Sequence, residues 1–190
     1  MIYIVDDFLP KNLFKELLTY CDKFEEFKTP GKSFWIKELP DDFVNFFKNK
    51  IEKVEGRKIK NILCFLREAK KNQDNTWRIH NDTIINGEKP DRAIVYYIKA
   101  NEKQLNGTAF WNHETYGDKY IQSDSVEFNR MLTEDAENIS KWSLRSVVGY
   151  KPNRLLSYPC EYFHSKYPNE YNNKRIVLVM FYKYEGTETK

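Results

Sequence analysis

The segment KRIVLVMFYKY, residues 174–184, has the composition of a β-strand. Val, Ile, Phe and Tyr are enriched in strands because their side chains pack well on a pleated, half-buried surface. Upstream segments of the same character, each bounded by Asn, Gly, Pro or Asp, are KIKNILCFLREAK (58–70), RAIVYYIKA (92–100), GTAFWN (107–112), WSLRSVVGY (142–150) and RLLSY (154–158). This series of short strands indicates an antiparallel β core, built as a barrel or a sandwich.

Two amphipathic helices are expected before this core. The first follows the short strand IYIV (2–5) and Pro10, and its apolar residues recur at helical spacing: Leu13, Phe14, Leu17, Leu18 and Cys21. The second follows the strand-like SFWIKEL (33–39), opens at Pro40 and ends at Gly56. Its apolar residues are Phe43, Phe46, Phe47, Ile51 and Val54.

These elements predict one α+β, mainly β domain over residues 1–190. Residues 1–57 supply a strand and the supporting helices, and residues 58–190 supply the β core. A helix-like segment at 124–137 interrupts the later strands. The expected plan is a β core with helices on one side.

The composition excludes several classes of protein. Aromatic residues make up 16% of the 190 residues, which is enough to fill a core and argues against disorder. The net charge of +3 comes from 31 cations and 28 acids spread along the chain, with no dedicated nucleic-acid-binding motif. No apolar run approaches the roughly 20 residues of a membrane span. The three cysteines form no CxxC pair and the N-terminus does not resemble a signal peptide, so we expect free thiols and a cytoplasmic location.

The segment WRIHND, residues 77–82, places His80 two residues before Asp82. Side chains at this spacing on a strand point the same way, so an imidazole and a carboxylate could bind one metal ion. The alternative is an accidental neighbour, because an acid follows a histidine at this spacing in roughly one case in eight. His164, in EYFHSKY, supplies a second imidazole. Two histidines and one carboxylate are the facial-triad ligands of non-haem Fe(II) oxygenases.

Arg175 is the first charged side chain of the apolar strand IVLVMFY. A buried arginine is costly unless an anion meets it. One interpretation is an arginine at a sheet edge paired with a glutamate. The other is a guanidinium fork that binds a carboxylate.

Together, these residues and the strand order resemble the 2-oxoglutarate/Fe(II)-dependent dioxygenases, and within them the prolyl-4-hydroxylase-like group. IYIVDDFLPKNLFKELL resembles the opening strand and helix of that group, and RIHND with NGEKPDRAIVYYIKA resembles its first core strands. HSKYPNEYNNKRIVLVMFY matches its distal histidine and arginine strand. NGTAFW departs from the group's glycine pair, because Asn106 precedes Gly107. The resemblance implies a double-stranded β-helix, also called a jelly-roll or cupin-like core.

The resemblance also implies a set of cofactors. His80, Asp82 and His164 would bind Fe(II), and Arg175 would bind the C5 carboxylate of 2-oxoglutarate. Tyr97 would hydrogen-bond the same carboxylate, or else form part of the barrel wall. The reaction implied is hydroxylation with O₂ as oxidant and release of succinate and CO₂, with ascorbate as a candidate reductant.

Other residues are candidates for the pocket. Tyr158 is expected to line it, Trp77 to shape it or to pack in the core, and Arg78 to face the same side as His80. His113 is expected near the active site or on a loop. The polar runs REAKKNQDN (67–75) and NHETYGDKYIQSDS (112–125) are expected to line the substrate entrance.

The substrate class stays open at this point: a protein side chain, a free amino acid, a nucleobase or a small metabolite. Two other functions also fit the sequence. One is a metal-binding β-barrel without turnover that acts as a binding module. The other is a nucleic-acid-interacting protein that uses its lysines and aromatic residues.

Overall fold

The structure, a computed structural model, describes residues 1–23, 35–69, 76–100, 106–120, 126–169 and 174–186. In these residues two antiparallel sheets face each other. The major sheet has the strand order β1 (Tyr3–Val5), β7 (Arg154–Pro159), β4 (Arg92–Lys99), β9 (Arg175–Tyr184), β3 (Ile59–Ala69) and β2 (Trp35–Lys37). The minor sheet has the order β6 (Trp142–Gly149), β5 (Gly107–His113) and β8 (His164–Tyr167).

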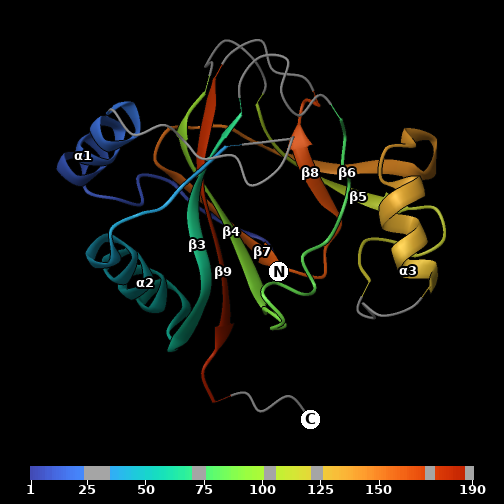
Figure 1. The fold of residues 1–190 in the computed structure, drawn as a ribbon, viewed down its shortest axis with the longest axis horizontal. Coiled ribbons are helices and arrows are strands. Elements are labelled where there is room, and N and C mark those ends of the chain that lie inside the picture. The colour runs from blue at the N-terminus through green and yellow to red at the C-terminus, as the bar shows by residue number, and fades with distance from the viewer. Residues whose placement is uncertain (24–34, 70–75, 101–105, 121–125, 170–173, 187–190) are drawn as a thin grey trace.

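Two helices cover the outer face of the major sheet (Figure 1). They are α1 (Lys11–Asp22) and α2 (Asp41–Glu55), and each begins directly after a proline, as predicted. Gly56 ends α2 with a φ of 66°, a left-handed conformation that glycine adopts without steric cost. Phe47 and Ile51 of α2 are fully buried against this face of the sheet.

The strand β9 separates two cores by the alternation of its side chains. Ile176, Leu178, Met180 and Tyr182 pack against the helices, whereas Val177, Val179 and Phe181 point between the two sheets. Arg175 has the parity of this second set, so its side chain also enters the space between the sheets.

A further layer covers the minor sheet on the side away from α1 and α2 (Figure 1). It consists of α3 (Val126–Arg130) and a π-helical turn, Met131–Asp135, followed by a short 3₁₀ helix, Ile139–Lys141. Phe128 and Met131 pack there against Trp111 and Trp142. The segment predicted as helical at 124–137 is helical from Val126 to Asp135, and it lies on the opposite side of the β core from α1 and α2.

Three other sequence-based expectations concern membrane spans, the cysteines and the polar runs. None of the helices in the described ranges has the length and apolar character needed to cross a membrane. Cys21, Cys64 and Cys160 are free thiols, and the cytoplasmic location stays a prediction. Parts of the two polar runs expected at the substrate entrance, residues 70–75 and 121–125, lie outside the described residues.

Candidate active site

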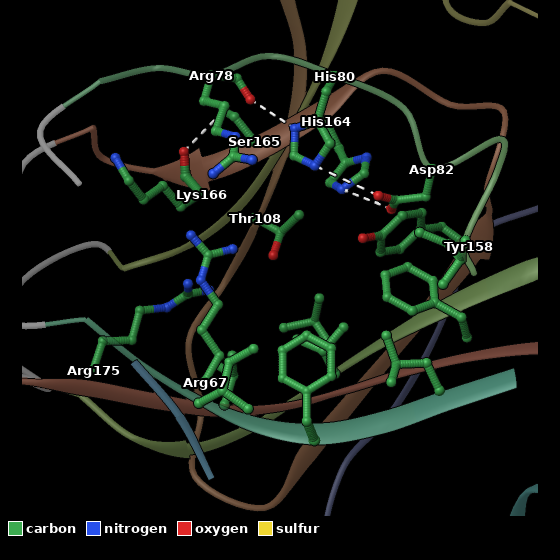
Figure 2. Close-up of a pocket in the computed structure, with 18 residues that line it drawn as sticks. Arg67, Arg78, His80, Asp82, Thr108, Tyr158, His164, Ser165, Lys166 and Arg175 are labelled. Atoms are coloured by element: carbon green, nitrogen blue, oxygen red, sulfur yellow. Dashed lines mark hydrogen bonds and ion pairs between the residues drawn. The ribbon is translucent and has the colours of Figure 1, made fainter. Parts of the chain in front are cut away.

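A cavity of about 340 Å³ lies between the inner faces of the two sheets. One wall is apolar and comes from β3, β4 and β9: Leu63, Phe65, Val95, Val177, Val179 and Phe181. The other lining residues are mostly polar, and those labelled in Figure 2 are Arg67, Arg78, His80, Asp82, Thr108, Tyr158, His164, Ser165, Lys166 and Arg175. The cavity thus combines an apolar wall with a group of titratable side chains, as is typical of ligand sites.

His80 and His164 are brought together by their main chains. The His80 N–H donates to the His164 carbonyl (3.1 Å), and the His164 N–H donates to the His80 carbonyl (2.8 Å). The segment around His80 forms only this isolated bridge rather than a full strand. The Asp82 N–H donates to the Cys160 carbonyl (2.9 Å), so both ends of the predicted motif are tied to the chain around β8.

The three predicted ligands converge on one point. Nε2 of His80 lies 3.5 Å from Oδ1 of Asp82, and Nε2 of His164 lies 3.2 Å from Oδ2 of Asp82. One ligand atom from each residue falls within 4.8 Å of the others. This spacing allows one metal ion to contact all three residues.

The hydrogen bonds of the two imidazoles fix which nitrogen faces Asp82. Nδ1 of His80 lies 2.7 Å from the Arg78 carbonyl, and Nδ1 of His164 lies 3.0 Å from the Tyr162 carbonyl. A carbonyl only accepts, so each Nδ1 carries the proton and each Nε2 of a neutral ring presents a lone pair to Asp82. Holding the far nitrogen in this way is how proteins orient histidines that bind metals.

The electrostatics of this group favour a bound cation. Burial and the neighbouring His164 lower the pKa of His80 to about 4, against the opposing effect of Asp82, so its ring is neutral near pH 7. Oδ2 of Asp82 is buried and accepts no hydrogen bond from the described residues. Burying a carboxylate oxygen without a partner is unfavourable, and a bound cation would remove this penalty. The residues present therefore fit a divalent metal ion such as Fe(II).

Tyr158 lines the cavity beside this group (Figure 2). Its ring centroid is 4.7 Å from that of His164. Burial first, and then the Asp82 carboxylate, raise the pKa of Tyr158 well above its ordinary value. The phenol therefore stays neutral and can act as a hydrogen-bond donor at the edge of the site.

Arg175 enters the same cavity from β9 and is 5% exposed. Its Nη2 donates to the Gly107 carbonyl (3.1 Å). Gly107 tolerates no side chain, because a Cβ atom there would overlap the Val148 carbonyl oxygen. The departure Asn106-Gly107 therefore keeps the glycine that the close approach of β5 and β6 requires.

Tyr97 contacts both Arg175 and Thr108. The guanidinium of Arg175 lies 5.7 Å from its ring, and its hydroxyl donates to Oγ1 of Thr108 (2.8 Å). Thr108 lines the cavity, whereas Tyr97 is not among the described lining residues. A direct bond from Tyr97 to a bound carboxylate stays a prediction.

Two other predicted residues lie away from the cavity. Trp77 packs edge-on against Trp111, with ring centroids 5.4 Å apart, which is the packing alternative given for it. His113 is the last residue of β5 rather than part of a loop. Its side chain is buried, and its Nε2 lies 3.1 Å from Oδ2 of Asp135. Neither side chain lines the cavity within the described part of the chain. Arg78, by contrast, lines the cavity together with His80.

Four polar lining residues were not among the predicted pocket residues: Arg67, Thr108, Ser165 and Lys166. Arg67 falls in both the predicted strand segment 58–70 and the polar run 67–75, and it is a residue of β3. The sequence did contain evidence for its position. Leu63, Phe65 and Arg67 are every second residue of the strand, so their side chains share the face that lines the cavity. This is the same pattern of an arginine on an apolar strand face that identified Arg175.

Comparisons with solved structures agree over nearly the whole chain, whereas no protein-family profile and no curated protein matches the sequence. The carbocyclase SnoK from nogalamycin biosynthesis, described as non-heme and alpha-ketoglutarate-dependent, matches with a TM-score of 0.65 and 10% identity. The match covers 95% of this chain and 78% of SnoK. A prolyl-4-hydroxylase from Pseudomonas putida matches with a TM-score of 0.58 and 11% identity, over 96% and 91% of the two chains.

A third match is HygX from Streptomyces hygroscopicus, solved with nickel and 2-oxoglutarate bound. Its TM-score is 0.64 at 7% identity, over 97% of this chain and 83% of HygX. The chain has the fold of the 2-oxoglutarate-dependent oxygenases. The predicted double-stranded β-helix with supporting N-terminal helices is thereby confirmed, and so is the resemblance of the fold to prolyl 4-hydroxylases.

Proposed function

We propose that the protein is an Fe(II)- and 2-oxoglutarate-dependent oxygenase that hydroxylates its substrate. The observation that carries the proposal is the convergence of Nε2 of His80, Nε2 of His164 and the Asp82 carboxylate within 4.8 Å. This ligand set leaves coordination positions open for other molecules. The nickel and 2-oxoglutarate bound in HygX, which has the same fold, support the same pair of ligands here.

Each part of the cavity has a role in this proposal. His80, Asp82 and His164 hold Fe(II), and Arg175 holds the C5 carboxylate of 2-oxoglutarate. When bound, the metal and 2-oxoglutarate supply the oxidising chemistry, consuming O₂ and releasing succinate and CO₂. The apolar wall of β3 and β9 excludes water from the reacting groups. Ascorbate stays a candidate reductant.

The position of Arg175 also supports the proposal. Its Nη2 donates to the Gly107 carbonyl, and this hydrogen bond holds the side chain in the cavity. A guanidinium carries five N–H donors in a planar fork, and this fork matches a carboxylate in bidentate geometry. The neighbouring Thr108 hydroxyl can reorient to donate to the same carboxylate.

The test is an anaerobic titration of metal-free protein with Fe(II) and then 2-oxoglutarate, followed by visible absorption. We expect a weak charge-transfer band in the native protein and no band in His80→Ala. His113→Ala is the matched control, because it removes a buried histidine outside the cavity and should keep the band. Bound iron without a band in the native protein would contradict the proposal.

A second measurement separates an active enzyme from a metal-binding barrel without turnover. Under air, the native protein should convert 2-oxoglutarate to succinate. A band without any succinate, also in the presence of ascorbate, would favour the binding module.

A further inference from the structure

The cavity has two sides of different chemistry. Figure 2 shows Arg67 and Arg175 on one side of it, and Asp82 and Tyr158 on the other. Along β3, Arg67 and Leu63 are four residues apart, which is about 13 Å of extended chain. The part of the cavity next to the predicted metal ligands is therefore built from different residues than the part next to the guanidinium groups.

The side near the metal ligands contains an apolar row that crosses four strands. Leu63 of β3 is paired with Phe181 of β9. Ala93 of β4 is paired with Phe181 and also with Tyr158 of β7. Directly paired residues share one face of a sheet, so these four side chains lie next to one another on the inner face. We call them the apolar row, and it ends with the Tyr158 ring 4.7 Å from the ring of His164.

Ile85 adds a further apolar side chain to this part of the cavity. It follows Asp82 by three residues, lines the cavity and packs against the apolar cluster between the sheets. Its N–H and its carbonyl are both hydrogen-bonded to the main chain of Glu88 (2.9 Å each). Asn86 and Gly87 between them have φ values of 51° and 75°, as expected for the central residues of a type I′ turn.

The turn that carries Ile85 is anchored to the major sheet. The Glu88 carboxylate accepts from Nζ of Lys60 on β3 (2.9 Å) and from Nζ of Lys183 on β9 (2.5 Å). One surface ion pair contributes little stability, but these two join the turn to two neighbouring strands. Ile85 is therefore held at the cavity by its own main chain and by the side chain of Glu88.

Some of the apolar lining keeps surface that a ligand could cover. Leu63, Phe65 and Ile85 are only partly buried, although all three line the cavity. The lining residues Val95 and Val177, by contrast, are buried. Removing apolar surface from water is favourable, so a ligand that covers these side chains with hydrocarbon gains affinity. A charged group in the same place would lose its hydration against hydrocarbon.

We infer that the apolar row and Ile85 bind an uncharged hydrocarbon group of the substrate, and that Ile85 is a specificity-determining residue. This inference rests on the proposed function, in which 2-oxoglutarate extends from the metal ligands to Arg175. Arg175 is paired with Ala69, six residues along β3 from Leu63, so 2-oxoglutarate and the apolar row use different parts of the cavity. Because the row ends beside the metal ligands, the carbon to be hydroxylated belongs to the hydrocarbon group.

The size of the cavity limits this group. Its volume of about 340 Å³ is at the lower end for ligand sites and must also hold 2-oxoglutarate. Only a short hydrocarbon group then enters, and any larger part of the substrate stays outside the cavity.

The test is NMR of protein with labelled isoleucine and leucine methyl groups, titrated with 1-propanol, 1-butanol and 1-pentanol. The protein is loaded with 2-oxoglutarate and Zn(II), which fits the same ligands and has no redox chemistry. We expect the methyl signals of Leu63 and Ile85 to shift, and the affinity to rise about fourfold for each added methylene. Ile84 is 50% exposed and is not among the described lining residues, so its signal should stay in place.

The variant Ile85→Asn places an amide in this part of the cavity. It should bind 1-pentanol at least fivefold more weakly, measured at the Leu63 methyl groups, and its affinity for 2-oxoglutarate should change less than threefold. Ile84→Asn makes the same change one residue earlier and should bind both molecules as the native protein does. Should Ile85→Asn fold poorly, Ile85→Ala removes apolar contact without adding a polar group and should weaken 1-pentanol binding at least threefold.

A paramagnetic ion tests whether the bound chain reaches the metal. With Co(II) in place of Zn(II), the signals at the methyl end of 1-pentanol should broaden more than those next to its hydroxyl. No broadening would place the bound alcohol away from the metal and would overturn its use of the substrate site.

Three other outcomes would overturn the inference. One is that no alcohol shifts the signals of Leu63 and Ile85, and another is that 1-pentanol binds Ile85→Asn as it binds the native protein. The third is that 2-oxoglutarate affinity falls together with alcohol affinity, because Ile85 would then belong to the 2-oxoglutarate site.

Failure of the proposed function gives a different result. In that case the Zn(II)-treated native protein would not bind 2-oxoglutarate at all. Alcohol binding that depends on Ile85 would still establish the hydrocarbon site, and its absence would reject it.

Discussion

The main chains of His80 and His164 exchange two hydrogen bonds, of 3.1 and 2.8 Å, and so hold their imidazoles 4.5 Å apart. The two residues are distant in sequence, and only the folded chain brings them together with Asp82. A ligand that needs all three residues binds the folded state alone and stabilises it by mass action. In the absence of a cation, the same arrangement directs two imidazole lone pairs at a carboxylate, which is unfavourable.

Asp82→Asn should therefore abolish metal binding and raise the stability of the metal-free protein. An amide has no charge to hold the metal, but its N–H₂ group can donate to Nε2 of His80 or His164. We expect the free energy of unfolding of the metal-free variant to rise by about 1 kcal/mol, the value of one added hydrogen bond. Saturating Ni(II), at about 100 times its Kd, should stabilise the native protein by about 2.7 kcal/mol and the variant by almost nothing.

Urea denaturation with chelator and with Ni(II) checks both expectations. His113→Asn serves as the control, because it replaces a buried imidazole outside the cavity. It should lower stability while leaving the gain from Ni(II) intact. If Ni(II) stabilised Asp82→Asn as much as it stabilises the native protein, Asp82 would not be a metal ligand.

Gly107→Ala should destabilise the fold and weaken binding at the proposed 2-oxoglutarate site. Its Cβ would overlap the Val148 carbonyl oxygen, so β5 would have to move away from β6. We expect a loss of about 2 kcal/mol in the free energy of unfolding, as for other overpacked sites. Because Arg175 donates to the Gly107 carbonyl, 2-oxoglutarate should also bind less tightly.

Gly56→Ala is the matched control for that change. Gly56 has a φ of 66° and no atom near its Cβ position, so an alanine there costs about 1 kcal/mol through its backbone alone. It ends α2, on the far side of the major sheet from the cavity. Equal effects of the two variants on 2-oxoglutarate affinity would show that Gly107 has no special role in the site.

The sequence predicted most of this fold because its strands carry a clear composition and alternation. Arg175 was identified as the first charged side chain of the apolar strand β9, whereas Arg67, which falls both in the strand segment 58–70 and in the polar run 67–75, was not considered for the cavity. The face covered by α3 could not be predicted, since helical periodicity identifies an apolar side without indicating the sheet it meets. Likewise, His80 and Asp82 suggested a metal site, but only tertiary pairing places His164 beside them.

Arg175→Met should weaken 2-oxoglutarate binding without affecting the metal. A hydrogen-bonded charge pair is worth about 1.5–3 kcal/mol, which corresponds to roughly a 10- to 150-fold rise in Kd. Calorimetry on Ni(II)-loaded protein measures this rise, and Ni(II) affinity in the same variant should stay within threefold of the native value. Arg154→Met, which removes an arginine paired with Asp6 on the molecular surface, is the control. A Kd for 2-oxoglutarate that stays unchanged in Arg175→Met would remove Arg175 from the site.

Glu52→Gln should make the stability of the protein less dependent on acid pH. Glu52 is 8% exposed and accepts hydrogen bonds from Nζ of Lys58 (2.8 Å) and from the Ile59 N–H (3.1 Å). The Lys58 ammonium, together with the Ile59 N–H and Lys48, lowers the pKa of Glu52 to about 2, against the opposing effect of burial. In the unfolded chain the pKa of a glutamate is about 4.3.

Because the pKa is lower in the folded state, the carboxylate stabilises the protein above about pH 4.3, and this contribution is lost as the pH falls toward 2. Glu52→Gln should therefore lower the free energy of unfolding by about 1–2 kcal/mol at pH 7. The difference from the native protein should shrink steadily between pH 4.3 and 2. Urea denaturation of metal-free protein across this range measures it, with Glu16→Gln, at an exposed position of α1, as the control. A deficit of constant size at every pH would mean that Glu52 contributes through packing rather than through its charge.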